Sequence, residues 1–362
     1  MRFRYIKAVL CNILCLAIIF TSVFFGDAFS TLVDSVAKPF IYNKELSQVL
    51  SQKEVCVNNN ELYSATGYSG GAYTSAFTDY VSADIQALKL QAEKLFEGYT
   101  KEGEIKEIQM GATSKTLSYG VVEVDNKTQN SINLKTILSQ KPSLKKLSSD
   151  EPSILIYHTH STEGYELLDL GWYAKEYNSR TKDTSKNVVR VGEELTATLE
   201  EAGFSVIHDK TIYDESYNGA YSRSRVSVEK YLKKYPSIQI TIDLHRDAIH
   251  YEDGTKCKPT ATINGKKAAQ VMIISGCEGN GVEDFPDWQK NLVFSTHLQG
   301  TVEEKYTGLM RPVFFCHRKY NMDVTPCSFL LEFGTDANTL EEAVYSAQLI
   351  GESFVRMLEE YK

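Results

Sequence analysis

Residues 153–163 read SILIYHTHSTE, an apolar run that is followed at once by two histidines and a glutamate. A short apolar run of this kind predicts a buried β-strand over Ser153–Tyr157. A second run, Ile238–Asp243, has the same character and is followed by Leu244-His-Arg-Asp247. Amphipathic helical patterns alternate with these and other short apolar runs. The alternation predicts an α/β fold with a single, mostly parallel sheet flanked by helices.

The clearest helical pattern covers residues 187–202, NVVRVGEELTATLEEA. One helical face carries Val188, Val191, Leu195 and Leu199, Asn187 suits the N-cap, and Gly203 suits the position just beyond the last turn. Further helices are expected over residues 221–234, 288–306 and 339–361, and further strands over 205–208, 313–316 and 328–332. A hairpin is expected to turn at Asn264-Gly265, with residues 270–275 as its return strand.

Polar side chains follow three of the expected strands. His158, His160 and Glu163 follow the first, Asp243, His245 and Asp247 follow the second, and Glu332 ends a third, which lies in Phe329-Leu-Leu-Glu-Phe-Gly334. Functional groups in open α/β sheets gather at the carboxyl ends of the strands. We therefore expect the three groups to converge on one edge of the sheet.

Histidine and carboxylate side chains in this arrangement fit a catalytic Zn²⁺ site with three protein ligands and an open position for water. Bound Zn²⁺ lowers the pKa of water to about 7, and a nearby carboxylate can exchange the proton. Glu332 is placed for that exchange. A single histidine after a strand is more often a hydrogen-bonding loop residue than a ligand, so the prediction rests on the two histidine clusters together. The cysteines form no C-x-x-C pair, which argues against a closed zinc ribbon.

The composition excludes some classes of protein. The 362 residues carry a net charge of -8, and 42% of them are hydrophobic. Nucleic-acid-binding domains are usually basic, and disordered chains have few apolar residues. We expect a folded protein that does not bind nucleic acid.

The N-terminus has the pattern of a membrane anchor. Arg2, Arg4 and Lys7 precede an apolar run over residues 8–25, and Gly26-Asp-Ala28 matches a cleavage site poorly. We expect a cytoplasmic tip over 1–7, an uncleaved transmembrane anchor over 8–28, a stalk over 29–115 and a catalytic domain over 116–362. Because basic residues stay in the cytoplasm, the catalytic domain should lie outside it.

Several segments together resemble stage II sporulation protein P, a family of endospore-forming bacteria. They are Ile154–Glu163, Asn187–Gly192, Ile242–Ala248, Tyr320-Asn321 and Phe329–Asn338, in matching order and spacing. The resemblance covers roughly residues 115–360.

The resemblance implies a catalytic domain similar to zinc-dependent N-acetylmuramoyl-L-alanine amidases. The implied activity is hydrolysis of peptidoglycan during forespore engulfment, by an amidase cut and an endopeptidase cut within cross-linked stem peptides. The implied location is the sporulation septum and the engulfing membrane. The implied partners are sporulation protein D, a lytic transglycosylase, and sporulation protein M, a membrane scaffold.

The resemblance also implies roles for individual residues. His160 and His245 match the two histidine ligands of the amidases, and Glu332 matches their catalytic glutamate. Glu163 is the first choice for the acidic ligand because it shares a loop with His160. Asp183, four residues before Asn187, is the alternative.

Three further residues lie close to the expected ligands. We expect His158 to orient the site, and Arg246 and Asp247 to bind substrate or to brace His245. Two other functions remain as alternatives: a zinc peptidase restricted to wall peptides, and a non-catalytic wall-binding scaffold.

Overall fold

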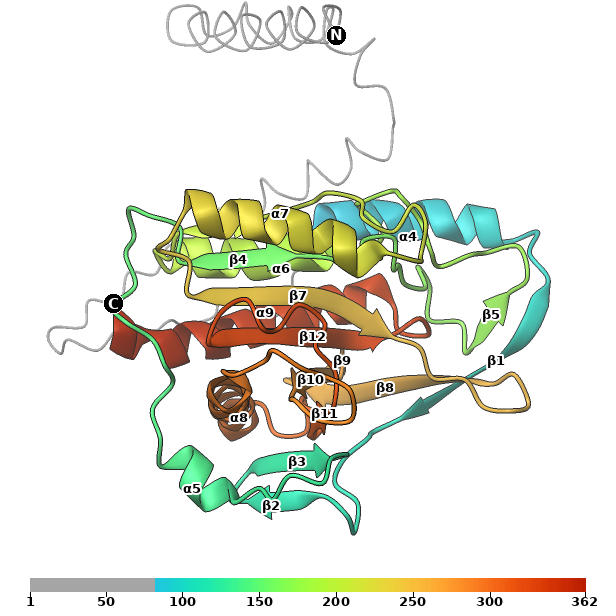
Figure 1. Cartoon of the computed structure of the whole chain (residues 1–362). Coiled ribbons are helices and arrows are strands. Elements are labelled where there is room, and N and C mark those ends of the chain that lie inside the picture. Colours follow the sequence, from blue (N-terminus) through green and yellow to red (C-terminus); the bar gives the residue numbers. More distant parts are fainter. Residues whose placement is uncertain (1–81) are drawn as a thin grey trace, which may run out of the picture. The chain divides into compact units, whose positions relative to one another are not determined.

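The computed structural model describes residues 82–362, so the predicted anchor and the first part of the predicted stalk lie outside the described residues. Its helices are α4 (Ala83–Phe96), α5 (Leu134–Leu138), α6 (Val188–Glu201), α7 (Ala220–Lys234), α8 (Trp288–Lys305) and α9 (Leu340–Leu358), with a 3₁₀ turn η1 (Glu359–Tyr361) (Figure 1). Its strands are β1 (Lys101–Ile108), β2 (Leu117–Tyr119), β3 (Val122–Asn126), β4 (Ile154–Tyr157), β5 (Trp172–Ala174), β6 (Val206–His208), β7 (Ile240–Asp247), β8 (Lys256–Ile263), β9 (Lys266–Ala269), β10 (Val271–Gly276), β11 (Val313–Cys316) and β12 (Cys327–Thr335).

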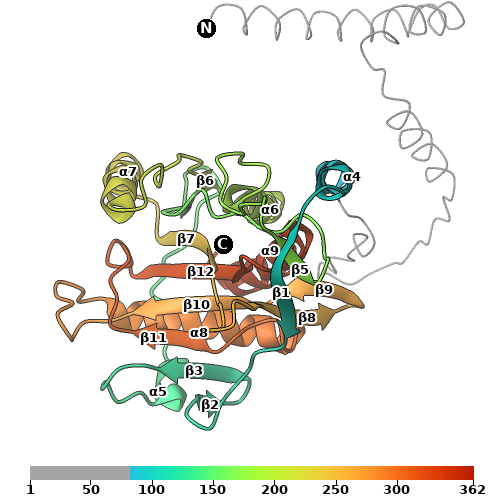
Figure 2. The ribbon, with the colours of Figure 1, turned by 90° about the vertical axis from the view of Figure 1, so that its right-hand side faces the viewer.

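The α/β class is confirmed, but the prediction of a single sheet is wrong. The larger sheet has eight strands in the order β2-β3-β11-β10-β12-β7-β4-β6, and the smaller sheet has four in the order β5-β1-β8-β9. In the larger sheet β2 is antiparallel to β3 and β10 is antiparallel to β12, while the other pairs are parallel. The eight strands run from β2 at one end of the molecule to β6 near α7 at the other (Figure 2).

The hairpin at Asn264-Gly265 shows why the chain forms a second sheet. Its turn forms at Asn264-Gly265 as predicted, with φ of 50° and 79°, but the return strand is β9, and β10 then enters the larger sheet. The chain changes sheets at Gln270, which is fully buried. Its side-chain amide accepts from Met110 N and donates to Met110 O and Gly308 O. It thus provides hydrogen-bond partners for backbone groups at the point where the chain leaves one sheet for the other. Residues 268–274 are apolar except for Gln270, so the sequence pattern does not show that the strand partner changes there.

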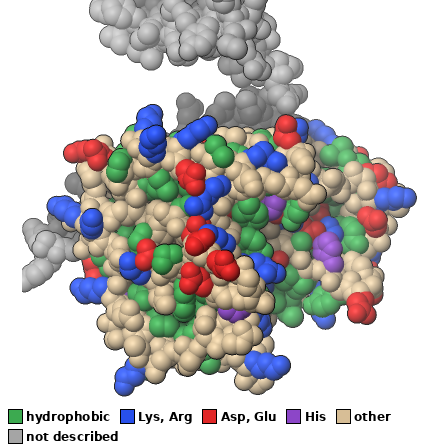
Figure 3. Space-filling view, viewed as in Figure 1, with side chains coloured by type: hydrophobic (Ala, Val, Ile, Leu, Met, Phe, Trp, Pro, Cys, Tyr) green, Lys and Arg blue, Asp and Glu red, His purple; other side chains and the backbone are tan. Residues whose placement is uncertain are grey.

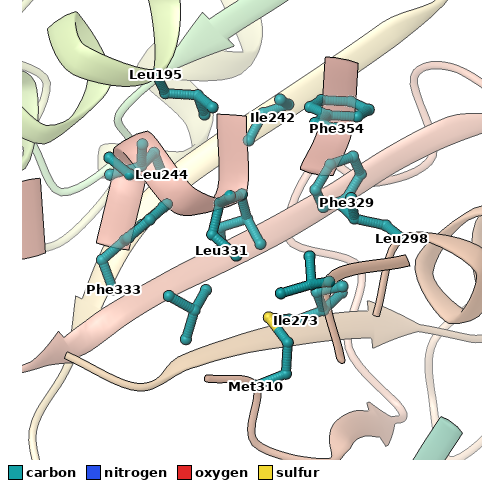
Figure 4. Packing of buried hydrophobic residues seen from close by; sticks show 14 of the residues in the cluster. Leu195, Ile242, Leu244, Ile273, Leu298, Met310, Phe329, Leu331, Phe333 and Phe354 are labelled. Carbon is teal, nitrogen blue, oxygen red and sulfur yellow. The ribbon is translucent and has the colours of Figure 1, made fainter. Parts of the chain in front are cut away.

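The two faces of the larger sheet carry different residues because side chains alternate along a strand. In β7, Ile240, Ile242 and Leu244 point into the main core with α6, α8 and α9, whereas Thr241, Asp243 and His245 point to the other face. Figure 4 shows the core side chains of β7 and β12 packed against Leu195 of α6 and Phe354 of α9. Helix α7 packs on the opposite face through Val228, against Leu155 and Tyr157 of β4. The face that carries His245 is thus the α7 face.

The helix ends follow the predicted signals. Asn187 caps α6 by accepting from Val189 N at 2.9 Å, and Gly203 has a φ of 85°, which favours glycine. Thr339 and Glu342 form a capping box at the start of α9. These caps place the first turn of each helix at the edge of the sheet.

The described part of the predicted stalk, residues 82–115, contributes α4 and β1. Strand β1 pairs with β5 and β8, and Ile85 of α4 belongs to the main core. Asp84 also bonds to Arg190 of α6 at 2.6 Å, so α4 is fixed to the body by both packing and charge. None of the helices in residues 82–362 combines the length and the apolar character needed to cross a bilayer.

Candidate active site

Three neighbouring parallel strands end at the site. Strand β7 lies between β4 and β12, with Tyr157 opposite Asp243 on one side and Glu332 opposite His245 on the other. The carboxyl ends of parallel strands meet at the same edge. The predicted convergence of the His160, His245 and Glu332 clusters on one edge therefore agrees with the topology.

Glu163 and His245 are in direct contact. His245 Nδ1 donates to Glu163 Oε2 at 3.2 Å, and both side chains are buried. The other carboxylate oxygen, Oε1, accepts from Arg180 at 3.2 Å, and the backbone N of Arg246 donates to Oε2 at 3.2 Å. Burial raises the pKa of Glu163, but the interactions with His245 and Arg246 outweigh it and lower the pKa to about 2. Glu163 is thus a carboxylate at neutral pH.

The loop after β4 requires a glycine next to Glu163. A Cβ on Gly164 would lie 2.1 Å from the carbonyl oxygen of Ser179. The carbonyl of Glu163 accepts from Val188 N at 2.8 Å, which ties the loop to the first turn of α6. Arg246 donates from Nε to Gly164 O at 2.9 Å and closes the loop from the β7 side. Arg246 therefore braces the loop that holds Glu163.

His160 completes a cluster with His245. The two ring centroids are 5.3 Å apart and the rings are nearly perpendicular, at 81°. His160 Nδ1 and His245 Nε2 are buried without a hydrogen-bond partner; Asp243 Oδ1 lies 2.9 Å from His245 Nε2 but is not aligned for a hydrogen bond. Burial and the neighbouring His245 lower the pKa of His160. Burial lowers the pKa of His245 too, but Asp243 and Glu163 raise it well above its usual value.

Glu332 lies beside this cluster with a buried oxygen that has no partner. Its Oε2 atom makes no hydrogen bond. Burial raises the pKa of Glu332 to about 8; Asp247 and Glu163 add to the rise, and His245 and Arg311 oppose it. Asp247 itself is paired with Arg311 at 2.9 Å. The environment therefore favours the protonated form of Glu332, whereas it favours the ionised form of Glu163.

His158 holds the backbone next to His245. Its Nδ1 donates to Leu244 O at 2.9 Å, and its Nε2 lies 2.8 Å from Nε2 of His208. Burial lowers the pKa of His158 to about 4, so the ring is neutral. A Cβ on Gly192 of α6 would lie 2.7 Å from His208 and 2.8 Å from His158. The predicted orienting role of His158 agrees with these contacts.

Asp183 lies apart from the other predicted residues. Its carboxylate is exposed, pairs with Lys186 at 2.8 Å and accepts from Ser185 at 2.6 Å. The structure brings Glu163, and not Asp183, into contact with His245. Asp183 closes a local turn before α6, which a pattern of spacing alone does not distinguish from a ligand position.

Sequence reasoning missed several residues around the cluster. Asp214 accepts from Thr162 N at 3.0 Å and from Arg180 at 3.0 Å, and its Oδ2 lies 3.8 Å from His160 Nδ1. Tyr217 stacks on His160, and His208 supports His158. These residues lie tens of positions from the ligand clusters and belong to no recognisable motif. Figure 3 shows that one face of the molecule has acidic, basic and histidine side chains interspersed among hydrophobic ones.

The side chains of the site can be compared with the ligands that a metal ion requires. In residues 82–362 no group of three or more His, Cys, Asp or Glu side chains already has the arrangement of a metal site. The chemistry of the donors nevertheless fits Zn²⁺, because His160 Nδ1 is buried without a hydrogen-bond partner and the neighbouring ring of His245 contacts the ionised Glu163 carboxylate through Nδ1. Buried polar atoms without partners are unfavourable, and a bound cation would satisfy them.

Fold and site together define an α/β protein with a site lined by histidines and carboxylates at the carboxyl edge of its sheet. The chain belongs to the stage II sporulation protein P family, whose model matches residues 76–355. Stage II sporulation protein P of Bacillus subtilis (strain 168) is 31% identical over 231 residues, which are 60% of this chain and 54% of that protein. The match thus spans about half the length of that relative.

Solved structures with some likeness include two amidases. N-acetylmuramoyl-L-alanine amidase AmiC2 of Nostoc punctiforme has 11% identity and a TM-score of 0.35, over 59% of this chain and 98% of that chain. The CwlD amidase of Clostridioides difficile, solved in complex with the GerS lipoprotein, has 12% identity and a TM-score of 0.33, over 58% of this chain and 98% of that chain.

Proposed function

We propose that this protein is a zinc-dependent peptidoglycan hydrolase that acts during forespore engulfment. The proposed cuts are the amide between N-acetylmuramic acid and L-alanine and a bond within cross-linked stem peptides. The observation that supports this function is the cluster formed by the contact between His245 and the Glu163 carboxylate, with buried atoms of His160 and Glu332 that have no hydrogen-bond partner. Membership of the sporulation family supports the substrate and the process.

His160, His245 and Glu163 would hold Zn²⁺. When bound, the ion would polarise the scissile carbonyl and acidify water. Arg180 and the backbone N of Arg246 keep the carboxylate of Glu163 ionised and oriented. His158 fixes the end of β7 and with it the position of His245.

Glu332 would move the proton. Hydrolysis forms a bond from the water oxygen to the carbonyl carbon, breaks the C–N bond and transfers a proton from water to the leaving amine. A carboxyl with a pKa of about 8 both accepts and donates near neutral pH. The buried Oε2 of Glu332 has no competing protein partner for that proton.

Muropeptide analysis of purified sacculi tests the function. Released stem peptides with intact glycan indicate the amidase cut, and opened cross-links indicate the endopeptidase cut. Cleavage of peptides alone would favour the wall-peptidase alternative. Binding without any release would favour the scaffold alternative. The Glu332→Gln variant serves as the inactive control.

We also propose that the catalytic domain works outside the cytoplasm, held by the N-terminal apolar segment at the sporulation septum and the engulfing membrane. The basic residues before that segment support this orientation. Sporulation proteins D and M are the proposed partners, on the basis of the family resemblance. Protease added to intact protoplasts should degrade the domain, and a protected domain would contradict the orientation.

A further inference from the structure

Three tyrosines, Tyr217, Tyr221 and Tyr320, line the His160 side of the site and are called the aromatic wall here. The ring of Tyr217 lies parallel to that of His160, with 4.5 Å between centroids and 1° between planes. Tyr221 packs edge-on against His160 at 5.5 Å and stacks on Tyr320 at 4.9 Å. The wall therefore covers one side of the candidate ligand and continues away from it.

Tyr217 presents an open aromatic surface beside the site. It remains 61% exposed although one face is stacked on His160 and the guanidinium carbon of Arg180 lies 5.4 Å from the ring centroid. A tyrosine with both faces fully covered could not keep that exposure, so much of the ring is open to solvent. An exposed aromatic ring next to a candidate catalytic cluster is available to a substrate.

The wall is held in place from several elements. Asn321 donates from Nδ2 to Tyr221 O and to Ser224 Oγ, both at 3.1 Å, and so ties the Tyr320 loop to α7. Tyr320 has a φ of 42°, a left-handed conformation that is strained in a bulky residue, and Asn321 follows with a φ of 55°, which asparagine adopts readily. Such strain persists only where surrounding contacts enforce it, and it concentrates at functional sites.

The loop that carries Tyr217 is anchored to the loop that carries His160. Asp214 accepts from Thr162 Oγ1 at 2.6 Å and from Thr162 N at 3.0 Å. Arg223 of α7 donates to Tyr213 O at 2.6 Å from the other side. Polar contacts at Tyr213 and Asp214 thus hold the loop that places Tyr217 over His160.

The opposite side of the site is charged. Strand β7 separates β4, which leads to His160, from β12, which carries Glu332. Next to Glu332 lie Asp247 and Arg311, paired at 2.9 Å. The side near His160 therefore carries the aromatic wall together with Arg180 and Asp214, and the side near Glu332 carries the Asp247–Arg311 pair.

We propose that the aromatic wall binds the pyranose ring of the muramic acid residue, with the stem peptide on the side of Asp247 and Arg311. This inference rests on the proposed amidase function. In that reaction the amine that leaves belongs to the peptide, and Glu332 must reach it. The peptide then extends past Glu332, and the sugar on the acyl side lies toward His160 and Tyr217.

The chemistry of the sugar and of the stem peptide agrees with this orientation of the substrate. A pyranose ring has an apolar C–H face that stacks on an aromatic ring. A stem peptide carries carboxylates and amines, which suit an arginine and an aspartate. The reverse orientation would leave the pyranose ring without the aromatic wall to stack on.

Two matched substrates test the proposal. One is an N-acetylmuramoyl peptide, and the other is the same peptide with an N-lactoyl group, which keeps the scissile amide but lacks the sugar ring. In the zinc-loaded enzyme, Tyr217→Ala should raise KM for the muramoyl peptide roughly 3- to 10-fold, the range of one aromatic contact. KM for the lactoyl peptide should not change. Tyr217→Phe should behave like the wild type because the ring face is retained.

Two controls distinguish a contact with the sugar from an indirect effect on the metal site or on the fold. Zinc content of Tyr217→Ala should stay stoichiometric, and loss of zinc would show that Tyr217 only supports His160 and would overturn the proposal. Tyr119→Ala removes another exposed tyrosine, from β2 at the far edge of the sheet, and should change neither KM.

Equal effects of Tyr217→Ala on both substrates, or no effect on either, would overturn the sugar assignment while the amidase function stands. Failure of the wild type to cleave either substrate would instead refute the proposed function, and this inference with it. An equal increase in both KM values would place the peptide, which the two substrates share, on the aromatic wall and reverse the proposed orientation.

Discussion

Replacing Glu332 by glutamine should separate proton transfer from metal binding. Gln has the shape of Glu but accepts no proton, and Oε2 of Glu332 has no protein partner that the change would disturb. Loss of general acid–base assistance typically costs ~10²–10⁴ in rate. We therefore expect Glu332→Gln to retain zinc and to lose turnover by that factor, while sacculus binding is kept.

The same substitution should change stability in the metal-free protein. Folding raises the pKa of Glu332 from 4.5 to about 8. Between these values the folded protein keeps a proton that the unfolded chain has lost, so the free energy of unfolding falls as pH rises. The fall corresponds to at most about 5 kcal/mol, and it ends above the folded pKa. Glu332→Gln has no such fall, because its side chain does not ionise.

Urea unfolding of metal-free protein at pH 5 and at pH 9 measures the difference. The variant should be only slightly more stable at pH 5 and clearly more stable at pH 9. Glu151→Gln, at an exposed carboxylate, is the matched control and should show no such change. Parallel pH dependence in wild type and Glu332→Gln would refute the buried-carboxyl reasoning. Loss of zinc would make Glu332 a ligand, and unchanged turnover would move the acid–base role elsewhere, with Asp247 the next candidate.

Three further predictions concern other residues. His160→Ala and His245→Ala should each abolish zinc binding and hydrolysis with little change in circular dichroism; stoichiometric zinc in either variant would rule that residue out as a ligand. Glu163→Ala should lower zinc affinity far more than Asp183→Ala in a metal titration, because only Glu163 contacts His245; the opposite order would make Asp183 the ligand. Burial raises the pKa of Glu166 from 4.5 to about 7, so wild-type stability should fall between those pH values by about 3 kcal/mol. Glu166→Gln should remove that fall in urea unfolding, and an unchanged pH profile would contradict it.

Local signals in the sequence determined the secondary structure near the site. The Asn187 cap and the Gly203 stop fall where helix α6 begins and ends, because a cap depends on residues within one turn of it. The turn at Asn264-Gly265 formed for the same reason, since its left-handed φ values suit Asn and Gly. The placement of His160, His245 and Glu332 on one edge followed from parallel strands that end together.

The pairing of the strands and the contacts between loops could be learned only from the tertiary structure. The apolar run of β10 has the same pattern whether it pairs with β8, as the predicted hairpin requires, or with β12, and only the assembled core decides between them. The predicted stalk likewise contains β1. Its residues are mostly exposed, so the sequence did not indicate that this segment pairs with β8.

The tertiary structure also decided which of the two predicted acidic residues contacts His245. Glu163 and Asp183 both lie at plausible spacings in the sequence, but only the loop closed by Gly164 and Arg246 brings Glu163 to His245. Asp214 and Tyr217 come from the loop between β6 and α7, and Arg180 comes from the loop after β5. Their contacts with the site depend on how α7 and the loop after β5 fold back over the sheet edge, which no local pattern encodes.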